Sequence, residues 1–280
     1  ASEISDKPSK REMDMLLTTG EQVTISLLAM ALQKRGLGAT SYTGWQAGIV
    51  TEDSHSNARI LDIQTEKIQA QLSLGNVVIV AGFQGATYDG EITTLGRGGS
   101  DTTAVAIAAA LKADRCDIYT DVTGVYTTDP RFISGARKLH SISYDEMLEM
   151  ANLGAGVLHP RAVEFAKNYQ VKLMVASSMV EEVGTLIEEE VSMEQNLIVR
   201  GIAFENDVTK ITVSGLPNQI ETLSNVFSLL SEHSINVDII IQNQTAEEKT
   251  SISFSTSRSS LEEALEVLNN HKEQLQFTEL

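Results

Sequence analysis

The chain has 280 residues, of which 42% are hydrophobic and 21% charged, and its formal net charge at pH 7 is -17. The composition is ordinary for a soluble protein, and the length suffices for a large core or for two domains. The negative charge argues against nucleic acid as a partner, because binding phosphates needs clustered Lys and Arg. No apolar run approaches the roughly 20 residues that span a bilayer, so no membrane partner is expected.

The first two thirds of the chain alternate helical and strand patterns. Helices are predicted over 9–35, 65–74, 104–111, 144–153 and 161–169, and strands over 77–83, 116–120 and 172–176. Gly36 and Gly75 stand where the first two helices should end. Alternation of this kind predicts a three-layer α/β fold with a mostly parallel sheet, whose ligands bind outside the carboxyl ends of the strands.

The last third has a different order of elements. Its predicted strands are 211–216, 235–242, 251–257 and 275–280, and its predicted helices are 219–233 and 261–272. The order βαββαβ predicts a smaller α+β, ferredoxin-like unit. An acidic stretch over 188–195 reads as a boundary, so we expect a first domain over 1–187, a connection over 188–208 and a second domain over 209–280.

The single cysteine, Cys116, excludes an intrachain disulfide and favours a reducing compartment, so we expect a cytoplasmic protein. Cys116 lies in an apolar strand pattern, which indicates a buried structural thiol. The five histidines show no metal-ligand spacing with one another or with Cys116, so no protein-bound metal site is predicted.

The segment Thr94-Leu95-Gly96-Arg97-Gly98-Gly99-Ser100-Asp101-Thr102-Thr103 leads from an apolar region into the alanine-rich helix. Its glycines allow close approach of a ligand, and the helix N-terminus offers N–H groups to an anion. Arg97 suits a carboxylate or phosphate, and Asp101 could hold an ammonium group. Both signs of charge in one loop predict a site for an amino acid beside a phosphoryl group. The alternative is a Gly-rich turn before a helix capped by Ser100, Asp101 or the threonines.

Two further segments carry candidate site residues. In 119–131, Asp121 follows a strand, Tyr126 could face a base or ribose, and Arg131 could reach a phosphate. The alternative here is a polar loop built from turn residues. Glu21, in Gly20-Glu21-Gln22, lies inside a well-patterned helix, and its alternative is an ordinary exposed glutamate.

These motifs resemble the aspartate kinases of the amino-acid kinase family. The resemblance also includes Ser41-Tyr42-Thr43-Gly44-Trp45-Gln46-Ala47-Gly48 and Leu153-Gly154-Ala155-Gly156-Val157-Leu158-His159-Pro160, and the last third resembles the ACT regulatory domain of these enzymes. In detail the chain is most similar to lysine-sensitive enzymes of Bacillus type. The resemblance implies phosphorylation of the aspartate β-carboxylate by Mg-ATP, the first step towards lysine, threonine and methionine.

The resemblance also implies roles for particular residues. Arg97 and Asp101 would be catalytic, and aspartate would be bound by Glu21, Arg97, Gly98, Gly99, Ser100 and Asp101. ATP would be bound by Thr120, Asp121, Tyr126 and Arg131, with Mg²⁺ held mainly by phosphate oxygens and water. An effector, lysine or else threonine, would be bound by Asn218, Asn236, Val237, Asp238 and Gln242. The ACT domain would pair with a second copy or with a regulatory subunit.

The chain also departs from the family pattern. Members begin with a strand and a Lys-Phe-Gly-Gly-Thr-Ser loop, and they carry a second ACT module, neither of which is found here; some have a lysine at the position of Gly156. We therefore expect a chain truncated at both ends that alone has little or no kinase activity. Two alternatives stay open: a sibling kinase of glutamate, acetylglutamate or a nucleotide, and a regulatory amino-acid-binding protein without catalysis.

Overall fold

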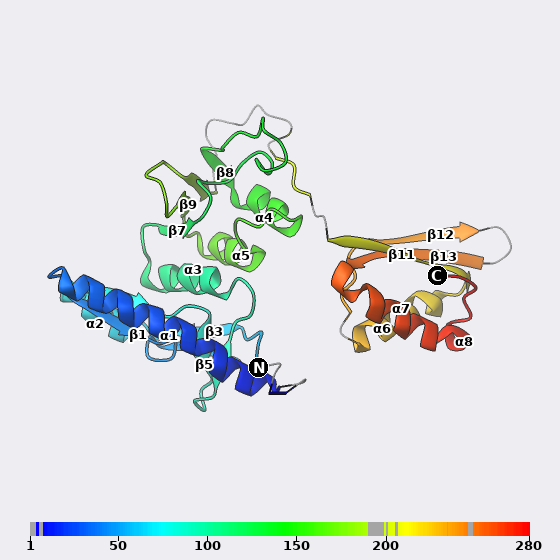
Figure 1. The fold of residues 1–280 in the computed structure, drawn as a ribbon, viewed down its shortest axis with the longest axis horizontal. Helices are drawn as coiled ribbons and strands as arrows, with labels where there is room; N and C mark the ends of the chain where they lie inside the picture. Colours follow the sequence, from blue (N-terminus) through cyan, green and yellow to red (C-terminus); the bar gives the residue numbers. More distant parts are fainter. Residues whose placement is uncertain are drawn as a thin grey trace. The chain divides into compact units, whose positions relative to one another are not determined.

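The computed structural model describes residues 4–5, 8–189, 199, 201–204, 207–233, 235–245 and 249–280. The chain divides into two compact units, Ala1–Phe204 and Glu205–Leu280. Each unit has its own sheets and its own hydrophobic core (Figure 1). Most of the connection expected over 188–208 lies outside the described residues.

Within the described part of the larger unit, strands form three sheets. One pairs β1 (Ala39–Tyr42) with β4 (Val77–Val80) in parallel. A second has the order β7 (Cys116–Thr120), β9 (Leu173–Ser177), β10 (Thr185–Glu188), β8 (Ser141–Ser143). A third has the order β3 (Ile60–Ile63), β2 (Ile49–Thr51), β5 (Gln84–Ala86), β6 (Ile92–Thr94).

The first two sheets confirm the predicted α/β class. The pairs β1–β4, β7–β9 and β8–β10 are parallel, and only β9–β10 is antiparallel. The strands differ from the prediction in their limits and in their number. The strand expected over 77–83 ends at Val80, and the left-handed Phe83 (φ 69°) follows shortly after it. The third sheet and the strands β1, β8 and β10 were not predicted, because strands of three or four residues are too short to show a period.

The helix α1 (Lys10–Lys34) confirms the first predicted helix. Its N-terminus is capped by Ser9, whose Oγ accepts from the N–H of Glu12, and it is followed by the left-handed Gly36 (φ 81°). One stripe of the helix is buried, and the helix contacts β1, β4 and β6. The buried residues of this stripe are Asp14, Thr18, Ile25 and Ala29.

By length and composition alone, α1 would also suffice to cross a membrane. An 18-residue window within it has a mean hydropathy of 1.4, so the expectation that no apolar run approaches spanning length is wrong for this helix. Core helices of soluble proteins meet the same criterion; α1 packs against three strands of this unit, with 17% of the window buried. One such helix is therefore weak evidence for a membrane.

Four more helices agree with the prediction: α2 (Glu66–Ser73), α3 (Gly99–Leu111), α4 (Tyr144–Asn152) and α5 (Pro160–Tyr169). The capping box of Ser143 and Glu146 fixes the start of α4, and Pro160 occupies the first position of α5. In Figure 1 the helices α3, α5 and α4 are stacked in that order, and contacts join α3 to α5 and α5 to α4. Their apolar faces build the core of this unit with β7, β9 and β10.

The smaller unit is an antiparallel sheet with helices, as predicted for an ACT-like, ferredoxin-like fold (Figure 1). Its sheet order is β11 (Val208–Pro217), β13 (Lys249–Ser257), β12 (Ile240–Thr245). Its helices are α6 (Ile220–Glu232), α7 (Leu261–Asn270) and the short α8 (Lys272–Leu275). Phe254 of the central strand and Leu268 of α7 are fully buried in its core.

Two strands of this unit differ from the prediction. The strand expected over 235–242 begins only at Ile240, because the N–H of Ile239 donates to the side-chain Oγ of Ser255 rather than to a ladder carbonyl. The last strand, expected over 275–280, is reduced to a single bridge between Ser214 and Glu279. There α8 takes up the first residue of the expected strand, and the left-handed Gln276 (φ 56°) turns the chain.

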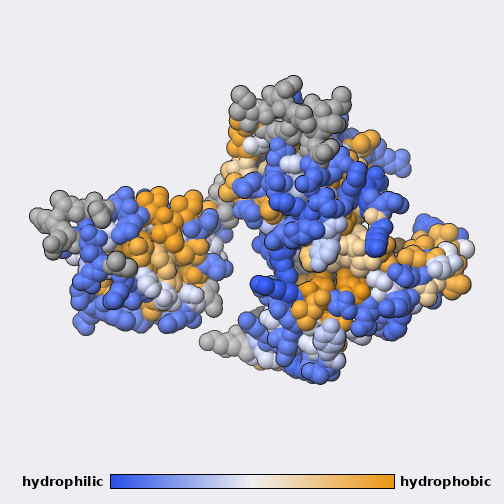
Figure 2. Space-filling view, turned by 180° about the vertical axis from the view of Figure 1, so that it is seen from behind, coloured by the Kyte–Doolittle hydropathy of each residue, from blue (hydrophilic) through white to orange (hydrophobic). Residues whose placement is uncertain are grey.

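Apolar side chains remain at the surface of both units, and in the larger unit they gather in a hollow on the face seen in Figure 2. The exposed apolar residues include Val23, Leu27, Leu28 and Met30 on α1, and Ile240 and Ile241 on the edge strand β12. An exposed apolar edge strand is a ready template for pairing with another chain.

Candidate active site

The loop between β6 and α3 follows a backbone path that its glycines make possible. Gly96 and Gly98 are left-handed, with φ of 74° and 71°. A Cβ atom on Gly98 would lie 2.1 Å from Cγ of His159, so no side chain fits there. Glycine is therefore required at position 98, because the backbone there combines a left-handed φ with a close approach to the start of α5.

Helix α3 begins at Gly99, two to five residues earlier than N-caps at Ser100, Asp101 or the threonines would place it. Gly98 is the N-cap, so Ser100 and Asp101 lie within the first turn instead of capping it. The side chains of Thr102 and Thr103 donate to the carbonyls of Gly98 and Gly99, at 2.9 and 2.7 Å. The sequence interpretation of these residues as N-caps is wrong, but the glycine loop does open onto a helix N-terminus, where anions are favoured.

The two charges of the loop have different surroundings. The side chain of Arg97 is exposed, and no hydrogen bond or ion pair holds it among the described residues. Asp101 is half-buried, and burial raises the pKa of its carboxyl group, opposed by a backbone hydrogen bond from His159 and by the charge of that histidine. The pKa of His159 is lowered, first by burial and then by the positive charges of Arg161 and Arg97. The loop therefore presents one free cation beside one desolvated carboxylate.

Glu21 lies on α1, one turn beyond the buried Thr18 and two turns beyond the buried Asp14. Residues three, four and seven apart share one face of a helix, so Glu21 continues the stripe that packs on the sheet. It is half-buried, unlike the exposed glutamate of the alternative interpretation. Among the described residues no hydrogen bond or ion pair joins its side chain to the loop.

The other four candidate residues lie at the last position of β7 and in the segment that follows it. Thr120 Oγ1 donates to Asp121 at 3.1 Å, and the hydroxyls of Tyr126 and Thr123 are 2.7 Å apart. Arg131 is exposed and forms an ion pair with Asp129 at 2.6 Å. Because 112–115 join α3 to β7 and the two elements contact, they run antiparallel, so the start of α3 and the end of β7 lie at the same end of this unit.

The five candidate effector residues all lie in the smaller unit. Asn236, Val237 and Asp238 precede β12 rather than forming part of it, and the N–H of Asp238 donates to the carbonyl of Ser255 at 3.0 Å. Gln242, within β12, donates from its side chain to Thr250. Asn218 is exposed just before α6, beyond the left-handed Gly215 of β11.

Sequence reasoning missed the residues that anchor the glycine loop. The guanidinium of Arg161 donates to the carbonyls of Leu95 and Ala58 and to Asn57, at 2.7, 3.2 and 3.2 Å. The carboxylate of Asp14 accepts from both the N–H and the hydroxyl of Thr94. Asp14 could have been noticed as a charged residue on the apolar stripe of α1. No sequence signal pointed to Arg161.

Cys116 is buried, and burial raises the pKa of its thiol to about 11. This agrees with the expected structural thiol, because a nucleophilic cysteine needs a lowered pKa. Among the described residues no group of three or more His, Cys, Asp and Glu could hold a metal ion.

Comparisons with known proteins agree with this architecture. The model of the amino acid kinase family matches residues 1–177, and an ACT domain model matches residues 211–271. The chain is 68% identical to an aspartokinase of Bacillus sp. (strain MGA3), covering 99% of this chain and 67% of that protein. It is also 68% identical to aspartokinase 2 of Bacillus subtilis (strain 168), covering 100% of this chain and 68% of that protein.

Solved structures give the same result. The crystal structure of E. coli aspartokinase III in complex with aspartate and ADP is 32% identical, with a TM-score of 0.75 over 96% of this chain and 62% of that one. The structure of aspartokinase III with lysine and aspartate is 34% identical, with a TM-score of 0.74 over 94% and 60%. The chain thus spans about two thirds of the length of the relatives that it matches.

The chain therefore belongs to the amino acid kinase family. Within that family it belongs with the aspartokinases that carry an ACT domain.

Proposed function

We propose that the protein is an aspartate kinase, which transfers the γ-phosphoryl group of ATP to the β-carboxylate of aspartate. The observation that carries the proposal is the loop from β6 to α3, where the free cation of Arg97 and the half-buried carboxylate of Asp101 flank a helix N-terminus. Aspartate has two carboxylates and one ammonium group, so it needs both signs of charge. The similarity to aspartokinases supports the same substrate.

The reaction needs positioning more than covalent catalysis. A β-carboxylate oxygen attacks the γ-phosphorus, the bond from that phosphorus to the bridging oxygen breaks, and ADP leaves with the electron pair. The attacking oxygen is already ionised at neutral pH, so no base must remove a proton. This fits a loop that offers donors and charge instead of an activated nucleophile.

Arg97 is placed to bind a carboxylate of aspartate, because its guanidinium is exposed and offers a fork of donors. Glu21 or Asp101 would hold the ammonium group, and for Asp101 a bound cation would offset the desolvation that raises the pKa of its carboxyl group. Backbone N–H groups of Gly98 and Ser100, at the start of α3, would face the transferred phosphoryl group, while Gly99, whose N–H donates to the carbonyl of Gly96 at 3.0 Å, would line the same site.

The nucleotide would bind to the segment after β7. Thr120 and Asp121 lie at the carboxyl end of that strand, Tyr126 could pack on the base or ribose, and Arg131 could leave Asp129 for a phosphate. Mg²⁺ would arrive with the ATP phosphates and neutralise their charge. The exposed carboxylate of Asp121 offers oxygen atoms of the kind that coordinate Mg²⁺. A kinase that uses ATP is expected in the cytoplasm.

The smaller unit would bind a regulatory amino acid, lysine more readily than threonine. Asp238 is exposed and could hold an ammonium group, and Asn236, Val237 and Gln242 lie near it in sequence. Asn218, just before α6, could receive the effector carboxylate at the helix N-terminus. The exposed isoleucines of β12 favour pairing with a second ACT unit, so we expect at least a dimer through this domain.

An ADP-release assay of the full-length protein with aspartate, glutamate, acetylglutamate and UMP tests the proposed reaction. Turnover with aspartate alone, in the range of about 1–100 per second typical of kinases, is the expected result. Turnover with another acceptor would favour a sibling kinase, and ATP-independent amino-acid binding without turnover would favour a regulatory protein. Calorimetric titration with lysine, beside Asp238→Ala, tests the effector site, and equal binding by both proteins would remove Asp238 from it.

A further inference from the structure

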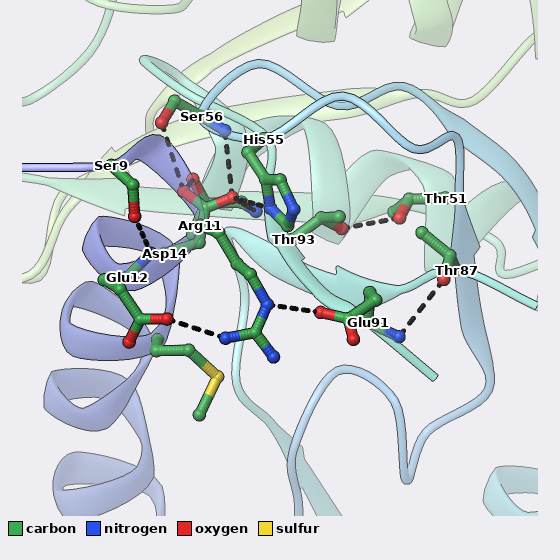
Figure 3. Close-up of polar contacts among 12 residues, drawn as sticks. Ser9, Arg11, Glu12, Asp14, Thr51, His55, Ser56, Thr87, Glu91 and Thr93 are labelled. Atoms are coloured by element: carbon green, nitrogen blue, oxygen red, sulfur yellow. Dashed lines mark hydrogen bonds and ion pairs between the residues drawn. The ribbon is translucent and has the colours of Figure 1, made fainter. Parts of the chain in front are cut away.

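A carboxylate that the proposed reaction does not use is fully buried next to the candidate aspartate site. Asp14, on the second turn of α1, has no exposed surface. Its Oδ2 accepts from the N–H of Thr94 at 3.0 Å, the N–H of Ser56 at 2.9 Å and Nδ1 of His55 at 3.1 Å. Its Oδ1 accepts from the hydroxyls of Thr94 and Ser56, at 2.7 and 3.3 Å. Figure 3 shows Ser56 and His55 next to Asp14, with dashed lines for their hydrogen bonds.

This number of donors is needed to keep a charge in the interior. A buried carboxylate is costly unless its lone pairs are satisfied, and an apolar side chain would fill the same space with less demand on its neighbours. Asp14 draws its donors from two segments far apart in sequence, 55–56 and Thr94. Hydrogen bonds to a charged acceptor are shorter and stronger than neutral ones, so the carboxylate fixes two backbones at once.

Both fixed backbones lead to the glycine loop. Thr94 is the last residue of β6 and stands three residues before Arg97. Ser56 is held in a left-handed conformation (φ 70°), and its carbonyl would lie 2.8 Å from a Cβ on Gly96. The carbonyl of Thr94 accepts from the N–H of Ala58 at 2.9 Å, which ties the two segments together.

A second clamp lies one residue further along. The carbonyl of Leu95 accepts from Arg161, and its N–H donates to the carbonyl of Phe83 at 2.9 Å. The exit of β6 is therefore held by Asp14 through Thr94 and by Arg161 through Leu95. The next side chain of the loop is that of Arg97, which no hydrogen bond or ion pair holds among the described residues. Its direction depends on the backbone that these two clamps fix.

We propose that Asp14 is a positioning residue for aspartate binding: through Thr94 and Ser56 it sets the path of the loop that aims Arg97 at the substrate carboxylate. The proposal rests on the proposed function, in which Arg97 binds aspartate. Asp14 touches neither aspartate nor ATP in this scheme. Its loss should therefore weaken the use of aspartate selectively and leave the use of ATP unchanged.

Steady-state kinetics of the full-length protein separate this role from a purely structural one. Asp14→Ala should raise the KM for aspartate at least tenfold and change the KM for ATP less than twofold. Asp14→Asn should restore most of the affinity for aspartate, because an amide oxygen still accepts from the two N–H groups while its NH₂ group can donate to the two hydroxyls. If Asp14→Ala raises both KM values equally, or neither, the proposal is wrong.

Thr93→Val is the matched control. The hydroxyl of Thr93 pairs with that of Thr51 at 2.5 Å inside the same sheet, next to Thr94 but without a bond to Asp14. Thr93→Val should lower the melting temperature as a buried polar change does, with the KM for aspartate kept within twofold. A rise in that KM equal to the rise in Asp14→Ala would show that general loosening of β6 explains both effects and would overturn the proposal.

If Asp14→Ala does not fold, Thr94→Val takes its place, since it removes only the 2.7 Å bond to Oδ1. We expect a rise of about threefold in the KM for aspartate, as for loss of one hydrogen bond, and an unchanged value would overturn the proposal. Arg97→Lys is then combined with whichever of Asp14→Ala and Thr94→Val folds. The double variant should raise the KM for aspartate by less than the product of the two single effects, because both changes act through Arg97. Absence of aspartate turnover in the full-length protein without substitutions would defeat the proposed function itself, whereas turnover that does not change on substitution of Asp14 or Thr94 defeats only the positioning role.

Discussion

The candidate side chains of the two binding segments in the larger unit have different partners. The loop from β6 to α3 is anchored from outside itself, by Asp14 on α1, by Arg161 on α5 and by the close packing of Gly98 on His159. In the segment after β7 the side chains bond to neighbours within the segment, through the pairs Thr120–Asp121, Thr123–Tyr126 and Asp129–Arg131, while its backbone is held from outside, by Thr185 at Val125 and by Ser178 at Thr120. The glycine loop has a preorganised backbone and a free Arg97, whereas the candidate side chains of the second segment must exchange local partners when a ligand binds.

The largest expected effect comes from breaking the anchored loop. Gly98→Ala places a Cβ 2.1 Å from Cγ of His159 at a left-handed position, so the backbone must move. We expect a loss of about 3 kcal/mol in the free energy of unfolding and a roughly hundredfold loss of activity. Gly75→Ala, also left-handed but with nothing within 4 Å, should cost only about 1 kcal/mol and leave activity intact. Similar results for both variants in denaturant melts and kinetics would contradict close packing of the loop.

Arg97→Lys keeps the charge of the loop and removes its fork of donors. We expect the KM for aspartate to rise about 10- to 100-fold, with the KM for ATP nearly unchanged, as for loss of a bidentate contact to a carboxylate. Initial-rate measurements with each substrate varied in turn check this. Equal rises for both substrates would show that Arg97 serves phosphate.

Asp101 sharpens the comparison through pH. Burial raises the pKa of its carboxyl group, so the charge that would hold the ammonium group is lost at a higher pH than for an ordinary aspartate. Affinity for aspartate should therefore fall on acidification, and Asp101→Asn should weaken affinity about tenfold at neutral pH and flatten the profile. An unchanged profile in this variant would assign the pH dependence elsewhere.

The same shift has the opposite sign for stability. A folded-state pKa above the unfolded value means that Asp101 contributes stability below the unfolded pKa, and that this contribution is lost as the pH rises through the folded pKa. Asp101→Asn should therefore melt at a higher temperature than the unmodified protein at neutral pH, and the difference should shrink in acid.

The smallest expected effect lies in the side-chain pairs of the segment after β7. Asp129→Asn frees Arg131 from its ion pair, and because exposed pairs are worth little, the KM for ATP should fall only about two- to threefold. The KM for aspartate should not change. Asp117→Asn, which breaks the exposed pair with Arg115 outside the segment, should change neither constant. A large effect of Asp129→Asn would mean that this segment is as preorganised as the glycine loop.

The same contrast explains what the sequence could predict. Long helices with marked ends were found because local signals define them, as Ser9 and Gly36 do for α1. The apolar strand 116–120 also has the predicted limits. The short strands of the sheet that contains β6 were missed, because three residues carry no period. The charged residues of the glycine loop were found from the loop itself. Asp14 and Arg161 were missed as its anchors, because they act across 80 and 66 residues of sequence, and only the folded chain brings them to Thr94 and Leu95.

The state of Cys116 has a practical consequence for spectroscopy. The chain has one thiol, buried in β7, with a pKa raised to about 11, so alkylating reagents should leave it unmodified in the native state. A cysteine introduced at an exposed position, such as Ser100→Cys beside Arg97, would then be the single site to react with a fluorophore. The native protein thus already has the background that site-specific labelling requires, and movement of the loop could be followed by emission without first removing a cysteine from the core.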